Sequence, residues 1–265
     1  MKKTMWATMA VAMILTMTGC QVNAGAQKKD IQSIEDLKYK TIACQSGTTG
    51  YAIVSDMEDY KTVEYPTSRE TFGALLGGNA DAVVMDRDVA ENMVESVKDK
   101  NPEVYIVDQP LSEEEFAIAY NKEDEELGQK LNQALEELRE EGTLTEITSH
   151  WIGENADQQP YIPPQKPTSG KKLRMATNAT YPPYESIPAG SDKVQGIDVD
   201  IMQAVCEKLD MELVVVNVEF ESILSCVESK SVDVGVAAIT VTDERKEKVS
   251  FTDSYAKSSQ VIITK

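Results

Sequence analysis

Two stretches with alternating strand and helix patterns lie on either side of a proline-rich segment, and this arrangement limits the possible folds most. Residues 40–108 and 173–265 each combine short apolar runs, such as DAVVMD and VDVGVAA, with helical patterns between them. Strands separated by helices favour βαβ units and a mostly parallel sheet. Residues 153–172 hold four prolines and no amphipathic period, as is typical of a linker. The sequence therefore predicts an α/β protein built from two units.

One helical region precedes the linker. In residues 123–152, Leu127, Leu131 and Leu135 recur at helical spacing, and Gly142 interrupts the pattern. The glutamates of this region lie mainly on the opposite face, which indicates solvation and not a binding site.

The composition excludes several classes of function. The chain has 265 residues and a formal net charge of −19, so it lacks the basic surface that nucleic-acid binding requires. Its one histidine, His150, leaves no histidine-based catalytic triad and no histidine-rich metal site. Cys44, Cys206 and Cys226 match no metal-ligand spacing and allow at most one disulfide. We therefore expect neither a metal nor nucleic acid as a partner.

The first twenty residues have the pattern of a bacterial lipoprotein leader. MKK gives a positive start, and the apolar run that follows ends in small residues before Cys20. This run is too short for a membrane span and is typical of a secretory signal peptide. TMTGC resembles a lipobox, although Met17 stands where Leu is usual; an ordinary signal peptide followed by a chance cysteine is the alternative. We predict a signal peptide over 1–19, lipidation of Cys20, a tether over 20–30 and an extracytoplasmic protein anchored to the membrane.

Several motifs together resemble the polar amino-acid-binding receptors of ABC importers (bacterial extracellular solute-binding proteins, family 3). They are ATNATYPPYE, GIDVDIMQAV and AAITVTDERKEKVSFTDSY after the linker, and DLKYKTIACQSGTTG and LNQALEELREEGTLTEITSHWIG before it. The resemblance implies a two-lobed, type II-like periplasmic-binding-protein fold, also called a Venus flytrap. It further implies a monomer without a cofactor that binds a free polar amino acid between its lobes and delivers it to a membrane permease.

The motifs stand in a different order from that of the family, in which the first lobe precedes the second. Residues 31–110 resemble the second lobe, and 111–152 resemble the hinge return and the closing helices that pack on the first lobe. Residues 173–265, after the linker over 153–172, resemble the first lobe. This order predicts a circular permutation, because the linker would join the family's usual C-terminus to its usual N-terminus.

Permutation has consequences for the ends of the chain. Residues 260–265 and 28–33 should lie side by side, because they mark a former hinge connection that is now cut. Residues 108–120 would then form the only covalent connection across the hinge. The competing interpretation is a piece of a tandem protein that carries halves of two different receptors.

Two charged residues are the candidates for binding the amino acid backbone. Arg245 is the expected partner of the ligand carboxylate, since a guanidinium can bind a carboxylate with two hydrogen bonds. It lies in the first turn of an expected helix capped by Thr242. Asp86 follows the apolar run AVVM, at the carboxyl end of a strand, and is the expected partner of the ammonium. The alternative for Asp86 is a helix N-cap, a role that Asp88 could equally fill.

The resemblance adds three contacts from backbone and hydroxyl groups. Thr240 is expected to contribute its hydroxyl and backbone N–H, and the Ala238 carbonyl to accept from the ammonium. Thr48, in the GTTG turn, resembles the carboxylate contact of the second lobe, where a helix N-terminus suits an anion.

Three further residues are expected around the ligand side chain. Tyr181 and Phe220 resemble the aromatic walls of the family's pocket, although each could instead belong to the core. Asn178 stands where many family members carry Asp. An amide there weakens the case for a cationic ligand, because it offers no buried counter-charge. The sequence does not name the amino acid.

Two other functions are compatible with the same fold. Cyclohexadienyl dehydratases resemble these receptors, but their chemistry needs an acid placed against a leaving hydroxyl, and no glutamate is clearly so placed in the sequence. A sensory ligand-binding module is the other alternative. We expect a transport receptor and not an enzyme.

Overall fold

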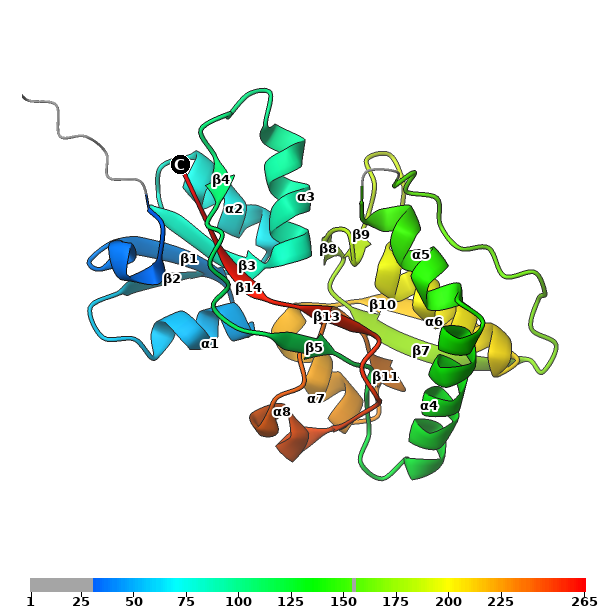
Figure 1. The fold of residues 1–265 in the computed structure, drawn as a ribbon. Helices are drawn as coiled ribbons and strands as arrows, with labels where there is room; N and C mark the ends of the chain where they lie inside the picture. The colour runs from blue at the N-terminus through cyan, green and yellow to red at the C-terminus, as the bar shows by residue number, and fades with distance from the viewer. Residues whose placement is uncertain (1–30, 154–155) are drawn as a thin grey trace, which may run out of the picture. The chain divides into compact units, whose positions relative to one another are not determined.

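A computed structural model describes residues 31–153 and 156–265, which form two five-stranded sheets with helices around them (Figure 1). The predicted signal peptide, Cys20 and the tether lie outside the described residues. We call the part of the chain built on the first sheet lobe A and the part built on the second sheet lobe B. Each sheet contains parallel and antiparallel strands, so the α/β class is confirmed.

Lobe A contains the N-terminal part of the described chain and the C-terminal strand. Its sheet has the order β2-β1-β3-β14-β4, with β1 parallel to its neighbours and β14 antiparallel to both of its own. The apolar run before Asp86 forms β3, which is buried along its whole length, as expected of a central strand. The elements are η1 (Ile34–Leu37), β1 (Thr41–Gln45), α1 (Thr49–Ser55), β2 (Lys61–Tyr65), α2 (Ser68–Leu76), β3 (Ala82–Asp86), α3 (Arg87–Val97), β4 (Tyr105–Ile106) and β14 (Gln260–Thr264).

Lobe B is built on the sheet β10-β7-β11-β6-β12, in which β7 is parallel to β10 and β11, and β6 is antiparallel to β11 and β12. A short hairpin of β8 and β9 follows β7 and reaches the other lobe. The elements are β6 (Ala119–Tyr120), α4 (Glu125–Glu140), α5 (Thr143–Trp151), β7 (Lys171–Thr177), β8 (Thr180–Tyr181), β9 (Glu185–Ser186), α6 (Ile197–Lys208), β10 (Met211–Asn217), η2 (Phe220–Ser222), α7 (Ile223–Glu228), β11 (Val234–Gly235), α8 (Asp243–Lys248) and β12 (Ser250–Phe251).

Two antiparallel strands, β5 (Glu114–Phe116) and β13 (Ala256–Ser258), connect the lobes. The expectation of a single covalent connection is therefore wrong. The chain continues from β13 into β14, which pairs with β3 from Gln260 opposite Asp86 to Thr264 opposite Ala82. This ladder of backbone hydrogen bonds holds the C-terminal strand in lobe A (Figure 1).

The start of the described chain meets the C-terminal strand at Tyr105. Tyr105 pairs with Thr264, and its hydroxyl accepts a hydrogen bond from the Ile31 N–H (3.0 Å) and donates one to the Ile31 carbonyl (3.1 Å). Ile31 and Ile262 also belong to one apolar cluster. Ile31 is thus connected to the C-terminal strand through Tyr105 of β4, while residues 28–30 of the predicted segment lie outside the described residues.

The helical region before the linker forms two helices. Gly142, with φ +81°, separates α4 from α5, because glycine takes this left-handed conformation without a steric penalty. Trp151, the last residue of α5, donates from its indole N–H to the Asp200 carboxylate of α6 (2.7 Å). This bond fixes the predicted closing helices on lobe B.

The proline-rich linker contains no helix or strand in its described residues 156–170. It is nevertheless attached to lobe B: the Tyr161 hydroxyl donates to Glu207 (2.8 Å), and the Thr168 N–H donates to the Asp210 carboxylate (2.6 Å). The linker therefore packs along the surface of α6.

The three cysteines of the described chain are free thiols. Burial raises the pKa of Cys44 and that of Cys206 to about 12, so neither is a reactive thiolate at neutral pH. As for membrane spans, no helix within residues 31–153 and 156–265 has the length and apolar character to cross a bilayer.

Candidate ligand pocket

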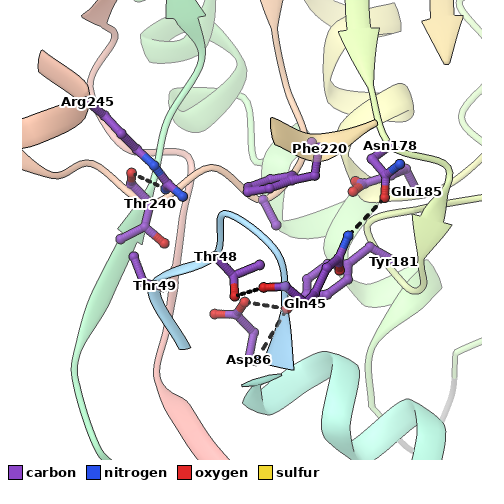
Figure 2. A pocket seen from close by; sticks show the side chains of 12 residues that line it. Gln45, Thr48, Thr49, Asp86, Asn178, Tyr181, Glu185, Phe220, Thr240 and Arg245 are labelled. Carbon is purple, nitrogen blue, oxygen red and sulfur yellow. Dashed lines mark hydrogen bonds between the residues drawn. The ribbon is translucent and has the colours of Figure 1, made fainter. Parts of the chain in front are cut away.

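A small pocket lies between the two lobes (Figure 2). All eight residues that the sequence predicts for ligand binding line it. The complete lining is Gln45, Thr48, Thr49, Asp86, Asn178, Tyr181, Glu185, Phe220, Ala237, Ala238, Thr240 and Arg245.

Arg245 reaches the pocket from α8, a helix whose predicted N-cap is confirmed: the Thr242 side chain accepts from the Arg245 N–H (3.2 Å). Its guanidinium donates to two backbone carbonyls, Thr240 (2.8 Å) and Gly47 (2.9 Å). The guanidinium carbon also lies 5.6 Å from the centre of the Phe220 ring, within cation–π range. Burial lowers the pKa of Arg245, but an arginine stays charged in proteins. Arg245 is thus a half-buried cation whose hydrogen bonds go to neutral groups.

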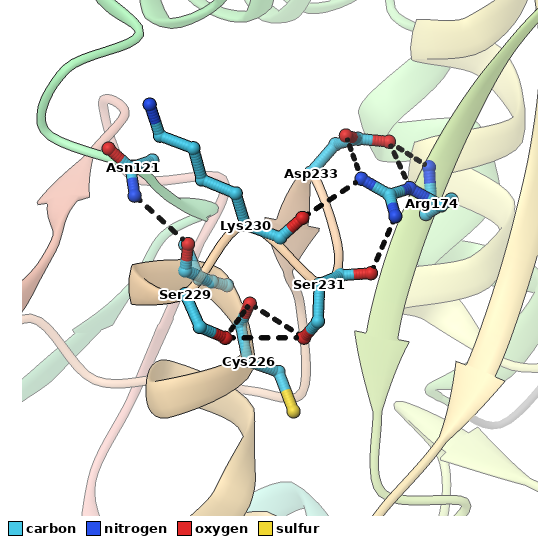
Figure 3. Close-up of polar contacts among 8 residues, drawn as sticks. Asn121, Arg174, Cys226, Ser229, Lys230, Ser231 and Asp233 are labelled. Atoms are coloured by element: carbon cyan, nitrogen blue, oxygen red, sulfur yellow. Dashed lines mark hydrogen bonds and ion pairs between the residues drawn. The ribbon is translucent and has the colours of Figure 1, made fainter.

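Arg174 shows how a structural arginine of the same chain differs. It binds the Asp233 carboxylate through Nε (3.2 Å) and Nη2 (2.8 Å), and its other contacts are the carbonyls of Ser231 and Lys230 (Figure 3). These bonds fix the turn between α7 and β11. Among the described residues, no carboxylate lies within ion-pair distance of Arg245, which leaves its charge for another partner.

Asp86 ends β3 and points into the pocket from lobe A. Although it stands at the N-cap position of α3, its side chain makes no capping bond, so the capping alternative does not hold. Its carboxylate instead accepts from the Tyr181 hydroxyl (2.6 Å) and from Gln260 Nε2 (2.9 Å). Burial, with the nearby Glu114 charge, raises the pKa of Asp86 to about 7. Asp88, the other capping candidate, accepts from the Tyr184 hydroxyl (2.6 Å).

Glu114 is a buried carboxylate that sequence reasoning missed. It lies on the connecting strand β5 and accepts from the hydroxyls of Thr49 (2.9 Å), Ser112 (3.0 Å) and Thr240. Because Thr49 belongs to lobe A and Thr240 to lobe B, Glu114 links both lobes behind the pocket. Glu113, Glu114 and Glu115 are all acidic, so no alternation in the sequence marks the middle one as buried.

The sequence analysis also missed Gln260, because the position of this residue depends on the insertion of β14 between β3 and β4. Its amide donates to Asp86, to Thr49 (3.2 Å) and to Glu114 (3.4 Å). A Cβ added at Gly50 would lie 2.6 Å from the Gln260 amide oxygen, so the first turn of α1 packs directly on this side chain. Gln260 therefore orients the Asp86 carboxylate without being a ligand contact itself.

Ala238 has an unusual backbone conformation at the pocket wall. Its φ of +47° lies in the left-handed region, which is costly for a residue with a Cβ. Its N–H donates to Asp198 (2.7 Å), a buried residue of α6. This bond holds the strained residue in place, as is common at binding sites. The role of the Ala238 carbonyl stays a prediction.

Two of the predicted contacts are engaged within the protein. The Thr48 hydroxyl caps α1 by accepting from the Tyr51 N–H (3.2 Å), and it donates to the Gln45 carbonyl (2.7 Å). The Asn178 amide donates to the Val218 carbonyl (2.8 Å) and accepts from the amide of Gln45 (3.2 Å) across the pocket. Asn178 thus connects the lobes at this end of the pocket.

Glu185, which sequence reasoning did not single out, lines the pocket beside Asn178, at the end away from Arg245 (Figure 2). Its side chain is buried, and neither carboxylate oxygen accepts a hydrogen bond from an N–H or O–H among the described residues. Its polar neighbour is the carboxyl group of Asp198. The pocket therefore does contain a buried acidic group beyond Asp86, and Asn178 alone gave an incomplete view of its charge.

One part of the chain matches a known family of proteins. Residues 173–265 match the sequence profile of the bacterial extracellular solute-binding proteins, family 3. The chain is 34% identical over 98 residues to ABC transporter arginine-binding protein 1 of Escherichia coli, covering 37% of this chain and 40% of that protein. It is 36% identical over 95 residues to the arginine-binding extracellular protein ArtP of Bacillus subtilis, covering 36% of each.

A solved structure gives a similar partial match. A Salmonella typhimurium periplasmic binding protein, described as having high arginine specificity, is 33% identical over 31% of this chain and 36% of that chain, with a TM-score of 0.30. The chain thus spans about two fifths of the length of the first curated relatives that it matches. These relatives are solute-binding proteins and not enzymes, as the sequence analysis expected of this chain.

Proposed function

We propose that this protein is an extracytoplasmic receptor that binds a free amino acid between its lobes and delivers it to an ABC importer. The observation that carries the proposal is the pair of oppositely charged groups in one pocket, the half-buried Arg245 on lobe B and the buried Asp86 on lobe A. An amino acid offers the matching carboxylate and ammonium, so its binding would join the two lobes. The match of residues 173–265 to solute-binding proteins supports this function.

The pocket favours an amino acid with a cationic side chain. Glu185 lies at the end opposite Arg245, where the ligand side chain would extend past the Phe220 ring (Figure 2). A buried carboxylate without hydrogen-bond donors is costly unless a cation binds it. The relatives named above are described as arginine-binding proteins, which agrees with a cationic ligand.

A thermal-shift screen of the twenty amino acids against the mature protein tests this function. A ligand that binds only the folded state stabilises it by about 2.7 kcal/mol at a hundred times its Kd. For a domain of this size, that corresponds to a rise in Tm of roughly 5–10 °C. We expect the largest rise with arginine. A screen in which no amino acid raises the Tm would contradict the proposed function.

The proposed architecture includes the circular permutation. It is supported by the order of the motifs, by the linker along α6, and by the contact of Tyr105 with both Ile31 and the C-terminal strand. Halves of two different receptors would not need to complete one sheet, yet β14 completes the sheet of lobe A.

Restoring the family order by protein engineering tests the permutation. The variant starts at Lys171, joins Lys265 through a few residues to Ile31, and ends near residue 157. We expect it to fold and to bind the same amino acid with the affinity of the natural order, because every element keeps its neighbours. A reordered chain that fails to fold, while a matched insertion of the same joining residues after Lys265 folds, would favour the tandem interpretation.

The proposed anchor is a lipid on Cys20. Cys20→Ser should move the protein from the membrane fraction to the soluble extracytoplasmic fraction and leave ligand affinity unchanged, since the tether precedes both lobes. Cell fractionation with immunodetection measures this, with Cys226→Ser as the matched cysteine control. Retention of Cys20→Ser in the membrane fraction would argue against lipid anchoring through this residue.

A further inference from the structure

Glu185 and Asp198 form a pair of facing carboxyl groups that the proposed function does not fully explain. Both side chains are fully buried, at 1% and 0% exposure. Neither oxygen of Glu185 accepts a hydrogen bond from an N–H or O–H of the described chain, whereas Asp198 accepts from the Ala238 N–H (2.7 Å) and faces the Tyr255 hydroxyl. One of the two groups lines the ligand pocket and the other supports it from α6.

Two facing carboxylates cannot both be charged at such a site without a cation. Removing two like charges from water is costly, and their mutual repulsion in a low dielectric adds to that cost. The charged groups around the pair do not relieve it. Asp86 on β3 and Asp88 on α3 add negative charge, while Tyr184 and Tyr255 are neutral. Arg245 lies at the other end of the pocket (Figure 2).

We propose that the Glu185–Asp198 pair holds a proton in the ligand-free protein and releases it to solvent when a cationic ligand side chain binds. Binding then exchanges one cation for another, and the buried charge of this end of the pocket does not change. This inference rests on the proposed function, because the exchange requires an amino acid in the pocket.

The proton belongs chiefly to Glu185. Asp198 is the better anion because the Ala238 N–H donates to it, and this bond opposes the rise in the pKa of Asp198 that burial causes. Glu185 has no such donor, and burial together with Asp198 raises its pKa well above the usual range. A guanidinium carries five N–H donors in a planar fork and would supply the missing bonds to Glu185, which favours the ionised carboxylate.

A comparison of arginine with citrulline separates proton release by the Glu185–Asp198 pair from proton release by other groups, such as Asp86. They have the same shape, but the citrulline side chain is a neutral ureido group, which can bond to a protonated Glu185. Both ligands carry the same carboxylate and ammonium, so any proton that Asp86 loses on binding is lost equally with both. The difference in proton release between the two ligands therefore reports on the Glu185–Asp198 pair alone.

Calorimetry in two buffers with different ionisation enthalpies, at the same pH, measures the proton count. We expect arginine to release about one proton more than citrulline near pH 6.5, and the ratio of their affinities to rise by up to about tenfold for each pH unit in the range where the pair titrates. Glu185→Gln should remove the difference in proton release. The exposed Glu212→Gln of β10 is the matched control and should keep it.

The outcomes distinguish the two proposals. If wild-type protein binds arginine and the proton counts for the two ligands are equal, the exchange is overturned and the receptor function stands. If neither ligand binds at any pH, the exchange is overturned, and the receptor function is then decided by the screen of the twenty amino acids. If citrulline binds too weakly to measure, the proton count for arginine in wild type and in Glu185→Gln replaces the comparison, and equal counts overturn the exchange.

Discussion

Arg245→Ala is expected to lower amino-acid affinity by about 30-fold to several thousand-fold, since truncating one partner of a buried charge pair costs about 2–5 kcal/mol. The reason is the position of the guanidinium, which lines the pocket and contacts only neutral carbonyls and the Phe220 ring. The ligand carboxylate is therefore its expected ionic partner. Isothermal calorimetry with arginine measures the loss.

Three control variants separate charge, geometry and fold. Arg245→Lys keeps the charge but loses the planar fork, so we expect an intermediate loss of affinity. Lys246→Ala removes an exposed cation from the same helix and should have no effect on binding. Arg174→Ala should lower the Tm, because it breaks the bonds to Asp233, and leave affinity unchanged. Unchanged affinity in Arg245→Ala itself would remove this residue from the site.

Those parts of the site that depend on local sequence could be predicted. The position of Asp86 follows from an apolar strand that ends at an acidic residue, and the helix of Arg245 follows from its Thr242 cap. The resemblance then indicated which residues share a pocket. The structure brings all eight of them to the lining of one pocket between the lobes.

Residues whose burial depends on distant pairing could not be predicted. Glu114 is buried because β5 pairs with β13, about 140 residues later in the chain. Gln260 reaches Asp86 only because β14 inserts next to β3. The same insertion gives the hinge its second crossing, which reasoning from the order of the motifs overlooked. A sequence pattern shows which face of a strand is apolar, but not which strand will cover it.

Asp86→Asn is expected to weaken amino-acid binding strongly and at the same time to stabilise the ligand-free protein above neutral pH. The amide has the shape of the carboxylate, but it offers no charge to the ligand ammonium, so affinity should fall by about 30-fold or more. The local bonds survive, because Gln260 still donates to the remaining oxygen and the Tyr181 hydroxyl can rotate to accept from the new amide.

The gain in stability follows from the pKa of Asp86, which is about 7 in the folded protein against an ordinary value of 3.8. A carboxyl group with a raised folded pKa binds its proton more tightly in the folded state. Its contribution to stability is therefore complete below pH 3.8 and is lost as the pH rises to about 7. At pH 8 the loss amounts to about 4 kcal/mol, which corresponds to roughly 9–17 °C in Tm, and Asp86→Asn should recover it.

Thermal melts of the wild type and of Asp86→Asn from pH 5 to pH 8, with and without arginine, test the loss of binding and the gain in stability together. We expect the Tm of the ligand-free variant to exceed that of wild type by a margin that grows with pH. Arginine should raise only the wild-type Tm, because the ligand ammonium supplies the counter-charge that Asp86 lacks. A purely structural Asp86 would give the opposite pattern, a lower Tm in the variant at every pH together with unchanged affinity. Its burial without a cation would then have no explanation, since an asparagine at this position would form the same fold at lower cost.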